Sequence, residues 1–263
     1  MKLKLGRKHF AFPYAAISLI FVIFPLFLLF YYSLTNLSGK FTFDNYIYFF
    51  TTQSIQKVML RSLYIAFLTT VICLLLAYPL AYVLSNSKYN KTTILVLLFI
   101  LPMWINFLLR TYAMKTFFSF VGIQDGFTAV IIGMAYDFFP FMLLPIYTIL
   151  VNMDKSYLEA STDLGASPVN TFLKVTLPLS LPGIVSGVLM VFMPTISTFA
   201  ISTMLGNSDT YLFGNIIDDY FSKNLWNRGS AFAFIMLLMI AITMLIAKYF
   251  TRGKTKKAKT SNL

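Results

Sequence analysis

The chain has 263 residues, of which 58% are hydrophobic and only 11% are charged. A soluble domain has about 25% charged residues, and so few charges could not cover a core of this size. The composition therefore excludes a soluble enzyme domain. It indicates an all-α polytopic membrane protein whose surplus apolar surface faces the lipid bilayer, with 28 Phe and 16 Tyr suited to lipid-facing walls and interfacial belts.

The formal net charge is +12, and a basic chain of this kind could bind nucleic acid. The basic residues lie in short loops and tails between apolar runs, so we expect no nucleic acid. The single cysteine, Cys73, lies inside an apolar run, and the single histidine, His9, lies in the basic N-terminal tail. These counts leave no disulfide framework, no metal site and no catalytic set for an integral-membrane enzyme.

A membrane-spanning helix needs about 20 mostly apolar residues. The first such run is too long for a signal peptide and has no cleavage site after it, so we expect it to stay as a span. The third is the weakest, because Asn106 and Arg110 interrupt its outer half. The approximate limits of the six predicted spans are 13–34, 62–85, 93–113, 127–151, 181–204 and 230–250.

Lys and Arg are enriched in cytoplasmic loops, so their distribution predicts orientation. With the N-terminus inside, 14 of the 21 Lys and Arg residues fall in inside segments and 7 in outside loops. An even number of spans also requires both termini on one side. We therefore predict a multi-pass cell-membrane protein with both termini in the cytoplasm and flexible basic tails.

The segment 152–183, between the fourth and fifth predicted spans, has strong local signals. Asp154 or Ser156 can cap a short helix, and Gly165 suits the position after its end, where φ is positive. Ser167 followed by Pro168 starts a second helix, which Pro178 is expected to stop. The sequence predicts a helix–Gly–helix elbow.

This elbow resembles the EAA loop of type I ABC-importer permeases. The matching residues are Glu159, Ala160, Ser161, Gly165, Val175, Leu177 and Pro178, with Ser161 in place of the usual second Ala. The resemblance implies that Glu159, Ala160, Ser161, Gly165 and Ala166 couple the permease to a cytoplasmic ATPase dimer. The small side chains would allow close approach between the two proteins, and Gly165 would set the angle of the elbow.

Three further segments extend the resemblance over most of the chain. Residues 101–112 and 139–147 are similar to the PotB-type permease subunit of spermidine/putrescine importers, and 61–82 is similar to the start of the permease core. The resemblance implies alternating access, a second homologous permease subunit and an extracellular polyamine-binding protein. Because the chain has no Gly-x-x-x-x-Gly-Lys-Ser/Thr motif, ATP and Mg would be bound by the partner ATPase, and this chain would bind no cofactor.

The resulting organisation has four parts. A basic tail, 1–12, precedes the first span and outer loop, 13–61. The permease core covers 62–250 and contains the EAA loop at 152–183. A Lys-rich tail, 251–263, follows it.

Asp137 is the first candidate for the substrate path, because an ionisable residue inside a span is costly and often functional. It lies near the middle of the fourth span, and Pro140 should free a backbone carbonyl near Tyr136. A carboxylate, carbonyls and aromatic faces suit a polycation. The alternative is that Asp137 bonds to a polar or basic group on another helix.

The third span supplies Trp104, Asn106 and Arg110. Trp104 could stack on a polyamine or simply pack, and the two interpretations weigh about equally. Asn106 and Arg110 are four residues apart and would share a helix face. Arg110 repels a polyamine, so we expect it at an outer gate or a subunit interface, or reaching to water.

Three prolines, Pro102, Pro140 and Pro194, interrupt predicted spans, as is tolerated along a water-filled path. Thr195, a candidate for this path, and Thr198 could bond to the freed backbone or simply hold helices together. Two alternatives remain open. The same architecture could import another small solute, such as an iron chelate, thiamine or a phosphonate, or the chain could be a channel, which would need no EAA elbow.

Overall fold

The computed structural model describes residues 17–85 and 92–260, without the side chains of 92, 93 and 249–260. The described chain is helical, and its one β feature is an isolated bridge between Thr35 and Phe41. The predicted all-α class is confirmed. The basic tail 1–12, the first residues of the first predicted span and the loop with Lys88 and Lys91 lie outside the described residues.

The chain divides into two compact units, each built from two segments. Unit 1 combines Met1–Gln56 with Ile216–Met239, and unit 2 combines Lys57–Asn215 with Ile240–Leu263. Helix α4 (Gln53–Ser85) begins at the end of the first segment of unit 1 and continues into unit 2.

Unit 1 is held by side-chain amides that bind backbone carbonyls. The Asn45 Nδ2 group donates to the carbonyls of Ser33 and Thr35 at 3.1 and 3.0 Å, and Asn227 Nδ2 donates to Thr35 Oγ1 at 3.0 Å. These bonds fix the loop before α3 to the start of α13. Unit 1 contains the helices η1 (Leu19–Ile23), α2 (Phe24–Ser33) and α3 (Asp44–Thr51), together with parts of α12 (Phe213–Ser222) and α13 (Trp226–Thr260).

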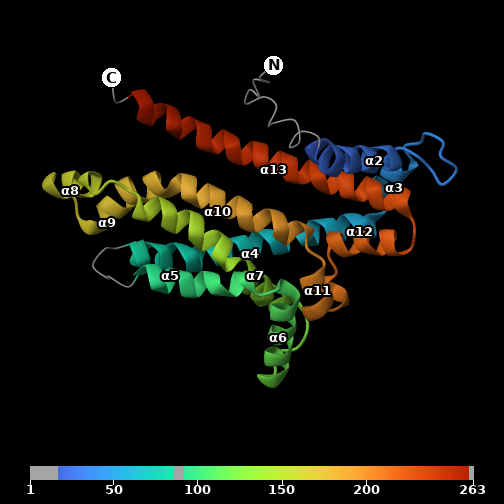
Figure 1. Ribbon diagram of the computed structural model, residues 1–263, viewed down its shortest axis with the longest axis horizontal. Coiled ribbons are helices and arrows are strands. Elements are labelled where there is room, and N and C mark those ends of the chain that lie inside the picture. The colour runs from blue at the N-terminus through green and yellow to red at the C-terminus, as the bar shows by residue number, and fades with distance from the viewer. Residues whose placement is uncertain (1–16, 86–91, 261–263) are drawn as a thin grey trace, which may run out of the picture. The chain divides into compact units, whose positions relative to one another are not determined.

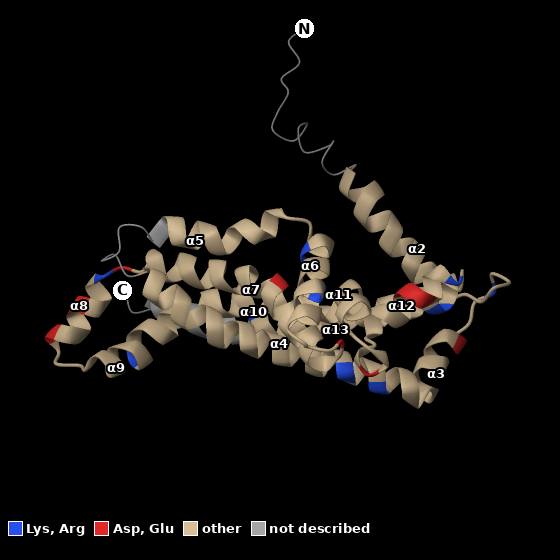
Figure 2. Ribbon diagram, turned by 90° about the horizontal axis from the view of Figure 1, so that it is seen from below, with Lys and Arg blue, Asp and Glu red and all other residues tan. Residues whose placement is uncertain are grey.

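In unit 2, α4, α7 and α10 run side by side, with α8 and α9 at one end and α6 and α11 at the other (Figure 1). These long helices contain few charged residues, namely Lys57, Arg61 and Asp137. Other charged residues of unit 2 gather at the α8–α9 turn and around α6 (Figure 2). The elements after α4 are α5 (Thr92–Ile100), η2 (Leu101–Trp104), α6 (Phe107–Phe120), α7 (Phe127–Val151), α8 (Ser156–Asp163), α9 (Pro168–Thr171), η3 (Phe172–Thr176), α10 (Leu177–Ser197), α11 (Ala200–Leu205) and η4 (Ser208–Thr210).

Close packing of α7 and α10 depends on two buried glycines of α10. A Cβ atom on Gly183 would lie 2.8 Å from the Pro145 carbonyl oxygen. One on Gly187 would lie 2.7 Å from Met142 Sδ. Small residues let membrane helices approach closely. Around this contact α4, α7 and α10 bury a common apolar cluster, with Cys73, Ala77 and Met142 among its members.

A second apolar cluster fastens the short helices α6 and α11 to α4 and α7. It includes Phe118 of α6, Ile201 and Leu205 of α11, and Ile65 and Met134 of the long helices. The end of unit 2 that carries α6 and α11 is therefore a packed layer with its own core.

Four described helices are long and apolar enough to cross a membrane, and a fifth span results if the bent pair Ile94–Trp104 and Phe107–Phe120 counts as one. The apolar helix Leu19–Ser33 is shorter than this criterion, and the start of the predicted 13–34 span is not described. The predicted spans 62–85, 127–151 and 230–250 lie within α4, α7 and α13.

Two of the predicted spans are broken in the structure. The 93–113 run bends by 97° after Trp104, because Asn106 starts a new helix by accepting a hydrogen bond from the Leu108 amide at 2.9 Å. The 181–204 run ends at Ser197, and α11 begins at Ala200 after extended backbone at Thr198. Hydropathy alone does not reveal these breaks.

Two predictions were wrong at helix ends. Pro178 does not stop the second elbow helix, which continues from Pro168 to Ser197 through a π-helical turn at Phe172–Thr176. The wider π turn tolerates the missing amide of Pro178. The C-terminal segment expected to be flexible is helical to Thr260, since Lys, Arg and Ala favour helix.

Candidate functional site

The turn between α8 and α9 has the predicted geometry. Gly165 has φ +76°, and the amides of Gly165 and Ala166 donate to the carbonyls of Thr162 and Ser161 at 2.8 and 3.0 Å. Ser167 then caps α9, and Pro168 occupies its first turn. The segment is therefore a helix, a left-handed glycine and a second helix in the structure.

The start of α8 is set by Asp154. Its Oδ1 accepts a hydrogen bond from the Ser156 amide at 2.9 Å, which lowers the pKa of this exposed carboxyl below its usual value. The carboxylate therefore stays charged near the helix N-terminus, where a negative charge is favourable.

Most of the elbow surface is open. Glu159, Ala160 and Gly165 are exposed, whereas Ser161 and Ala166 are half-buried at the contact between the two helices. Sequence reasoning missed Leu164, which is 88% exposed beside the glycine, and Val169, which is also exposed. Two apolar side chains in an otherwise polar connection were the available signal, because exposed apolar groups at a turn favour a docking surface.

The elbow also borders a cavity of about 270 Å³ at the adjoining ends of α4 and α7. Glu159 and Lys155 of the elbow line it, together with Tyr82 and Ser85 of α4. The start of the elbow therefore lies next to the end of α4 and shares a cavity with it.

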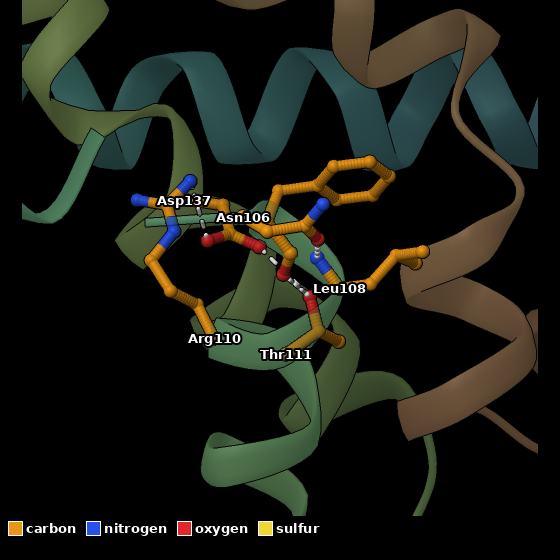
Figure 3. A network of polar contacts seen from close by, with 6 residues as sticks. Asn106, Leu108, Arg110, Thr111 and Asp137 are labelled. Atoms are coloured by element: carbon orange, nitrogen blue, oxygen red, sulfur yellow. Dashed lines mark hydrogen bonds and ion pairs between the residues drawn. The ribbon is translucent and has the colours of Figure 1, made fainter. Parts of the chain in front are cut away.

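The second candidate site is a buried ion pair between α6 and α7 (Figure 3). Arg110 Nη2 lies 3.1 Å from Asp137 Oδ1, and only 7% of Arg110 and 2% of Asp137 are exposed. The Thr111 hydroxyl lies 3.0 Å from Asp137 Oδ2 and 2.8 Å from the Phe107 carbonyl oxygen, so its one proton is shared between two acceptors. Of the two roles left open for Asp137, the contact with a basic group is present.

The ion pair leaves polar atoms unsatisfied. Among the described residues, Arg110 Nε and Nη1 have no hydrogen-bond acceptor, and Asp137 Oδ1 has no hydrogen-bond donor despite its ion pair. Strong arginine–carboxylate contacts use two parallel hydrogen bonds. This contact therefore uses only part of the hydrogen-bonding capacity of Arg110 and Asp137.

A cavity of about 530 Å³ lies beside the pair, at the level of the two helix breaks. Arg110, Asp137, Trp104 and Asn106 line it from α6, α7 and the preceding turn. From the other side it is bounded by the end of α10, with Pro194, Ser197 and Thr198. The breaks at Asn106 and Thr198 thus place polar groups around one hollow.

The residues predicted for the substrate path and the gate differ in where the structure places them. Trp104 is 84% exposed at the cavity rim, and the Tyr136 ring centre lies 5.8 Å from Arg110 Cζ. Thr195 is fully buried, and its hydroxyl donates to the Val191 carbonyl at 2.6 Å, which matches the backbone role. Asn106 is exposed and caps α6. The expectation that Arg110 reaches to water was wrong, because it is buried against Asp137.

No group of three or more His, Cys, Asp or Glu side chains that could hold a metal occurs within 17–85 and 94–248. The cavity at the helix breaks is lined by one ion pair, an amide, hydroxyls and aromatic faces. Such groups can bind and orient a polar solute.

Comparison with known families decides the class of protein. The model of the family described as "Binding-protein-dependent transport system inner membrane component" matches residues 10–256. The chain belongs to this family. It is therefore a multi-pass component of a transport system in the membrane.

Its curated relatives in this family include permeases with a named cargo. The spermidine/putrescine transport system permease protein PotB of Escherichia coli (strain K12) is 33% identical over 241 residues, which cover 82% of this chain and 85% of the relative. The PotB of Haemophilus influenzae (strain ATCC 51907 / DSM 11121 / KW20 / Rd) is 35% identical over 232 residues, covering 81% and 80%. The predicted resemblance to PotB-type permeases is confirmed.

Solved structures of ABC transporters contain chains with the same fold. A bacterial ABC transporter for the acidic polysaccharide alginate superposes with a TM-score of 0.70 over 93% of this chain and 94% of that chain, at 14% identity. The inward-facing MetNI methionine ABC transporter gives 0.63 over 76% and 95%, at 18% identity. The architecture is that of ABC-transporter permeases.

Proposed function

We propose that this chain is a permease subunit of an ABC importer for polyamines such as spermidine and putrescine. The exposed, Gly-hinged α8–α9 elbow, found in a chain of this transport family, carries the permease role. Relatives that are 33–35% identical over about four fifths of the chain, and that are named for spermidine and putrescine, support the cargo.

The elbow would be the contact with the ATPase. Leu164 and Val169 offer exposed apolar side chains, and the exposed Glu159 and Ala160 lie on the same short helix pair. A groove on a cytoplasmic ATPase could bury these groups. Because Glu159 also lines the cavity at the ends of α4 and α7, a movement of the elbow would be transmitted to the long helices.

The remaining machinery belongs to partner chains. We expect a cytoplasmic ATPase dimer to bind and hydrolyse ATP with Mg, a second homologous permease subunit to complete the path, and an extracellular binding protein to deliver the cargo. The relatives are parts of transport systems with several components, which supports this division of labour.

The cargo would pass the cavity at the two helix breaks. Asp137 offers a carboxylate, and Trp104 offers an aromatic face that attracts an ammonium group. Asn106 and Thr198 add polar groups on opposite sides of the hollow. This set suits a flexible polycation, whose amines need acceptors and aromatic faces at several points.

A second candidate cargo has one observation in its favour. Arg110 Nε and Nη1 lack acceptors among the described residues, and an anionic solute such as a phosphonate could supply them. The cargo of the relatives favours the polyamine, and competition experiments separate the two.

The test is uptake by bacterial cells that have no polyamine importer of their own. Cells that express this chain with its ATPase, second permease and binding protein should accumulate radiolabelled spermidine. Unlabelled putrescine should compete, whereas thiamine, a ferric chelate and a phosphonate should not. Competition by one of these solutes, with no effect of putrescine, would reject the polyamine assignment and keep the permease role.

The proposed orientation has both termini in the cytoplasm, with the α8–α9 elbow on the same side. The native cysteine is first removed by Cys73→Ala. Single cysteines then placed at Lys88, Lys155 or Lys256 should react with a membrane-impermeant maleimide only in inverted vesicles. A cysteine placed at Asn207 should react only from outside the cell. The reverse pattern would overturn this orientation.

A further inference from the structure

We propose that Arg110 is a resident competitor of the cargo: its guanidinium occupies the Asp137 carboxylate while the cavity is empty, and an ammonium group of the cargo displaces it. This inference rests on the proposed function and adds a specificity-determining residue to it. The cargo would then exchange one buried cation for another instead of entering a vacant acidic site.

The first observation is the charge balance of the site. Asp137 is 2% exposed and Arg110 is 7% exposed, so each needs the other to avoid an uncompensated buried charge. The pair is neutral overall. Because the pair is neutral, an added cation beside it gains little, so strong binding of a cation at Asp137 requires that Arg110 leave.

The second observation is that the pair is loosely made. One nitrogen of Arg110 approaches Asp137, at 3.1 Å, and Nε and Nη1 have no acceptor among the described residues. Buried donors without acceptors destabilise the state that contains them. Displacement of Arg110 therefore breaks one contact and allows the unsatisfied donors to find new acceptors.

The third observation is that the cavity has room for the displaced guanidinium and that Asp137 keeps a hydrogen bond. The cavity beside the pair measures about 530 Å³ and is lined by both residues, so a displaced guanidinium stays inside it. The Tyr136 ring centre already lies 5.8 Å from Arg110 Cζ, so the guanidinium can keep this cation–π contact when it leaves Asp137. The Thr111 hydroxyl, 3.0 Å from Oδ2, keeps Asp137 oriented after the exchange.

The exchange also predicts a preference for polyamines over monoamines. One ammonium group replaces the contact that Arg110 gives up, so its net gain is small. Every further ammonium group of the same molecule finds acceptors and aromatic faces, such as Trp104 at the cavity rim, without displacing anything. Multiple amines are therefore required for tight binding.

The test uses the assembled complex in lipid nanodiscs, without the binding protein, and measures binding of radiolabelled spermidine. In Arg110→Ala the competitor is gone, and spermidine should bind roughly tenfold more tightly than in the wild type, which corresponds to one broken contact of about 1.4 kcal/mol. Added ethylguanidinium should refill the space, compete with spermidine in Arg110→Ala and have little effect on the wild type. As a charge control, Lys223→Gln, which removes an exposed cation paired with Asp219, should bind spermidine as the wild type does.

Arg110→Ala leaves Asp137 without its ion pair, so the variant is purified in ethylguanidinium and its thermal unfolding is followed as a second readout. Ethylguanidinium should raise the unfolding temperature of Arg110→Ala but not of the wild type. Unchanged or weaker spermidine binding in Arg110→Ala, with no effect of ethylguanidinium on binding or unfolding, would overturn the exchange while leaving the proposed function intact. Failure of the wild-type transporter to take up any polyamine would instead remove the proposed function, and the exchange with it.

Discussion

The hydroxyl groups of Ser161 on α8 and Thr171 on α9 lie 2.9 Å apart and form a hydrogen bond across the elbow. Ser161 is the position where the resembling permeases usually have Ala, so this chain has a polar contact between the two helices that an Ala would not make. Ser161 lies before Gly165 and Thr171 lies after it, so the bond joins the two sides of the turn and helps to fix the angle that the glycine permits.

Ser161→Ala should therefore have a small effect. The loss of one half-buried hydrogen bond costs about 0.5–1.5 kcal/mol, and the small side chain still packs. Cargo-stimulated ATP hydrolysis of the assembled complex should stay within about threefold of the wild type. Thr171→Val, which removes the same bond from the other side, should match it, and a much larger loss in either variant would mean that the hydroxyl contacts a partner.

Gly165 is the more sensitive position, for a reason that can be isolated. Its φ is +76°, and no atom lies within 4 Å of where a Cβ would be placed, so the constraint is conformational rather than steric. Gly165→Pro fixes φ near −65° and should abolish cargo-stimulated ATP hydrolysis while the protein remains in the membrane. Gly165→Asn is the matched control, because Asn tolerates positive φ, and it should retain most of the stimulation.

Gly165→Ala should be intermediate, since a left-handed residue with a Cβ costs about 1–2 kcal/mol. The order Gly, Asn, Ala, Pro in coupling efficiency is the signature of a backbone requirement. Equal activity of all four would show that the elbow angle does not matter.

Asp137 has an internal ion pair with Arg110 and a proposed contact with the cargo, so its variants must be measured for both abundance and transport. Asp137→Asn leaves Arg110 buried without a counter-ion, which destabilises by about 3–5 kcal/mol, and the subunit level in the membrane should fall. Asp137→Asn combined with Arg110→Gln replaces the pair by two neutral side chains of similar size and should restore most of the abundance. Polyamine uptake per subunit should be at least roughly tenfold lower than in the wild type in both variants, because a charge-assisted contact of about 1.5–3 kcal/mol is lost.

Immunoblots of membranes and uptake assays on the same cells separate these effects. Uptake at the wild-type rate by the double variant would show that neither residue contacts the cargo. Wild-type abundance of the single variant would mean that water or a partner chain already compensates Arg110.

The contact of α7 with α10 should not tolerate bulk at Gly187. A Cβ there would lie 2.7 Å from Met142 Sδ and 3.1 Å from the Met142 carbonyl oxygen, so Gly187→Leu must separate the two helices. Overpacking of this kind costs about 1–3 kcal/mol, and the thermal stability of the complex should fall. Ser186→Leu, at the neighbouring exposed position of the same helix, is the control and should be neutral. A similar loss in both variants would indicate a general effect of leucine in α10.

Much of the elbow was predictable because its signals are local. Positive φ at Gly165 and the start of α9 at Ser167 and Pro168 follow from conformational preferences of single residues. The stop at Pro178 did not follow, because the π-helical turn before it depends on how the segment joins α10.

The breaks in the membrane helices were harder to predict from the sequence. Hydropathy averages over about 20 residues, so it reports that a run is apolar and not that it bends at Asn106 or ends at Ser197. The pairing of Arg110 with Asp137 joins residues of two different helices, and only the folded arrangement of α6 and α7 shows it. The sequence could propose both roles of Asp137 without choosing between them.

The most direct test of the proposed function is accumulation of cargo by purified components. The complex of this chain with its second permease and ATPase is reconstituted in liposomes, with the binding protein added on the outside and ATP enclosed. We expect radiolabelled spermidine to accumulate inside only when ATP can be hydrolysed, and Gly165→Pro to abolish this accumulation. ATP-dependent accumulation of another solute, with none of spermidine or putrescine, would contradict the account.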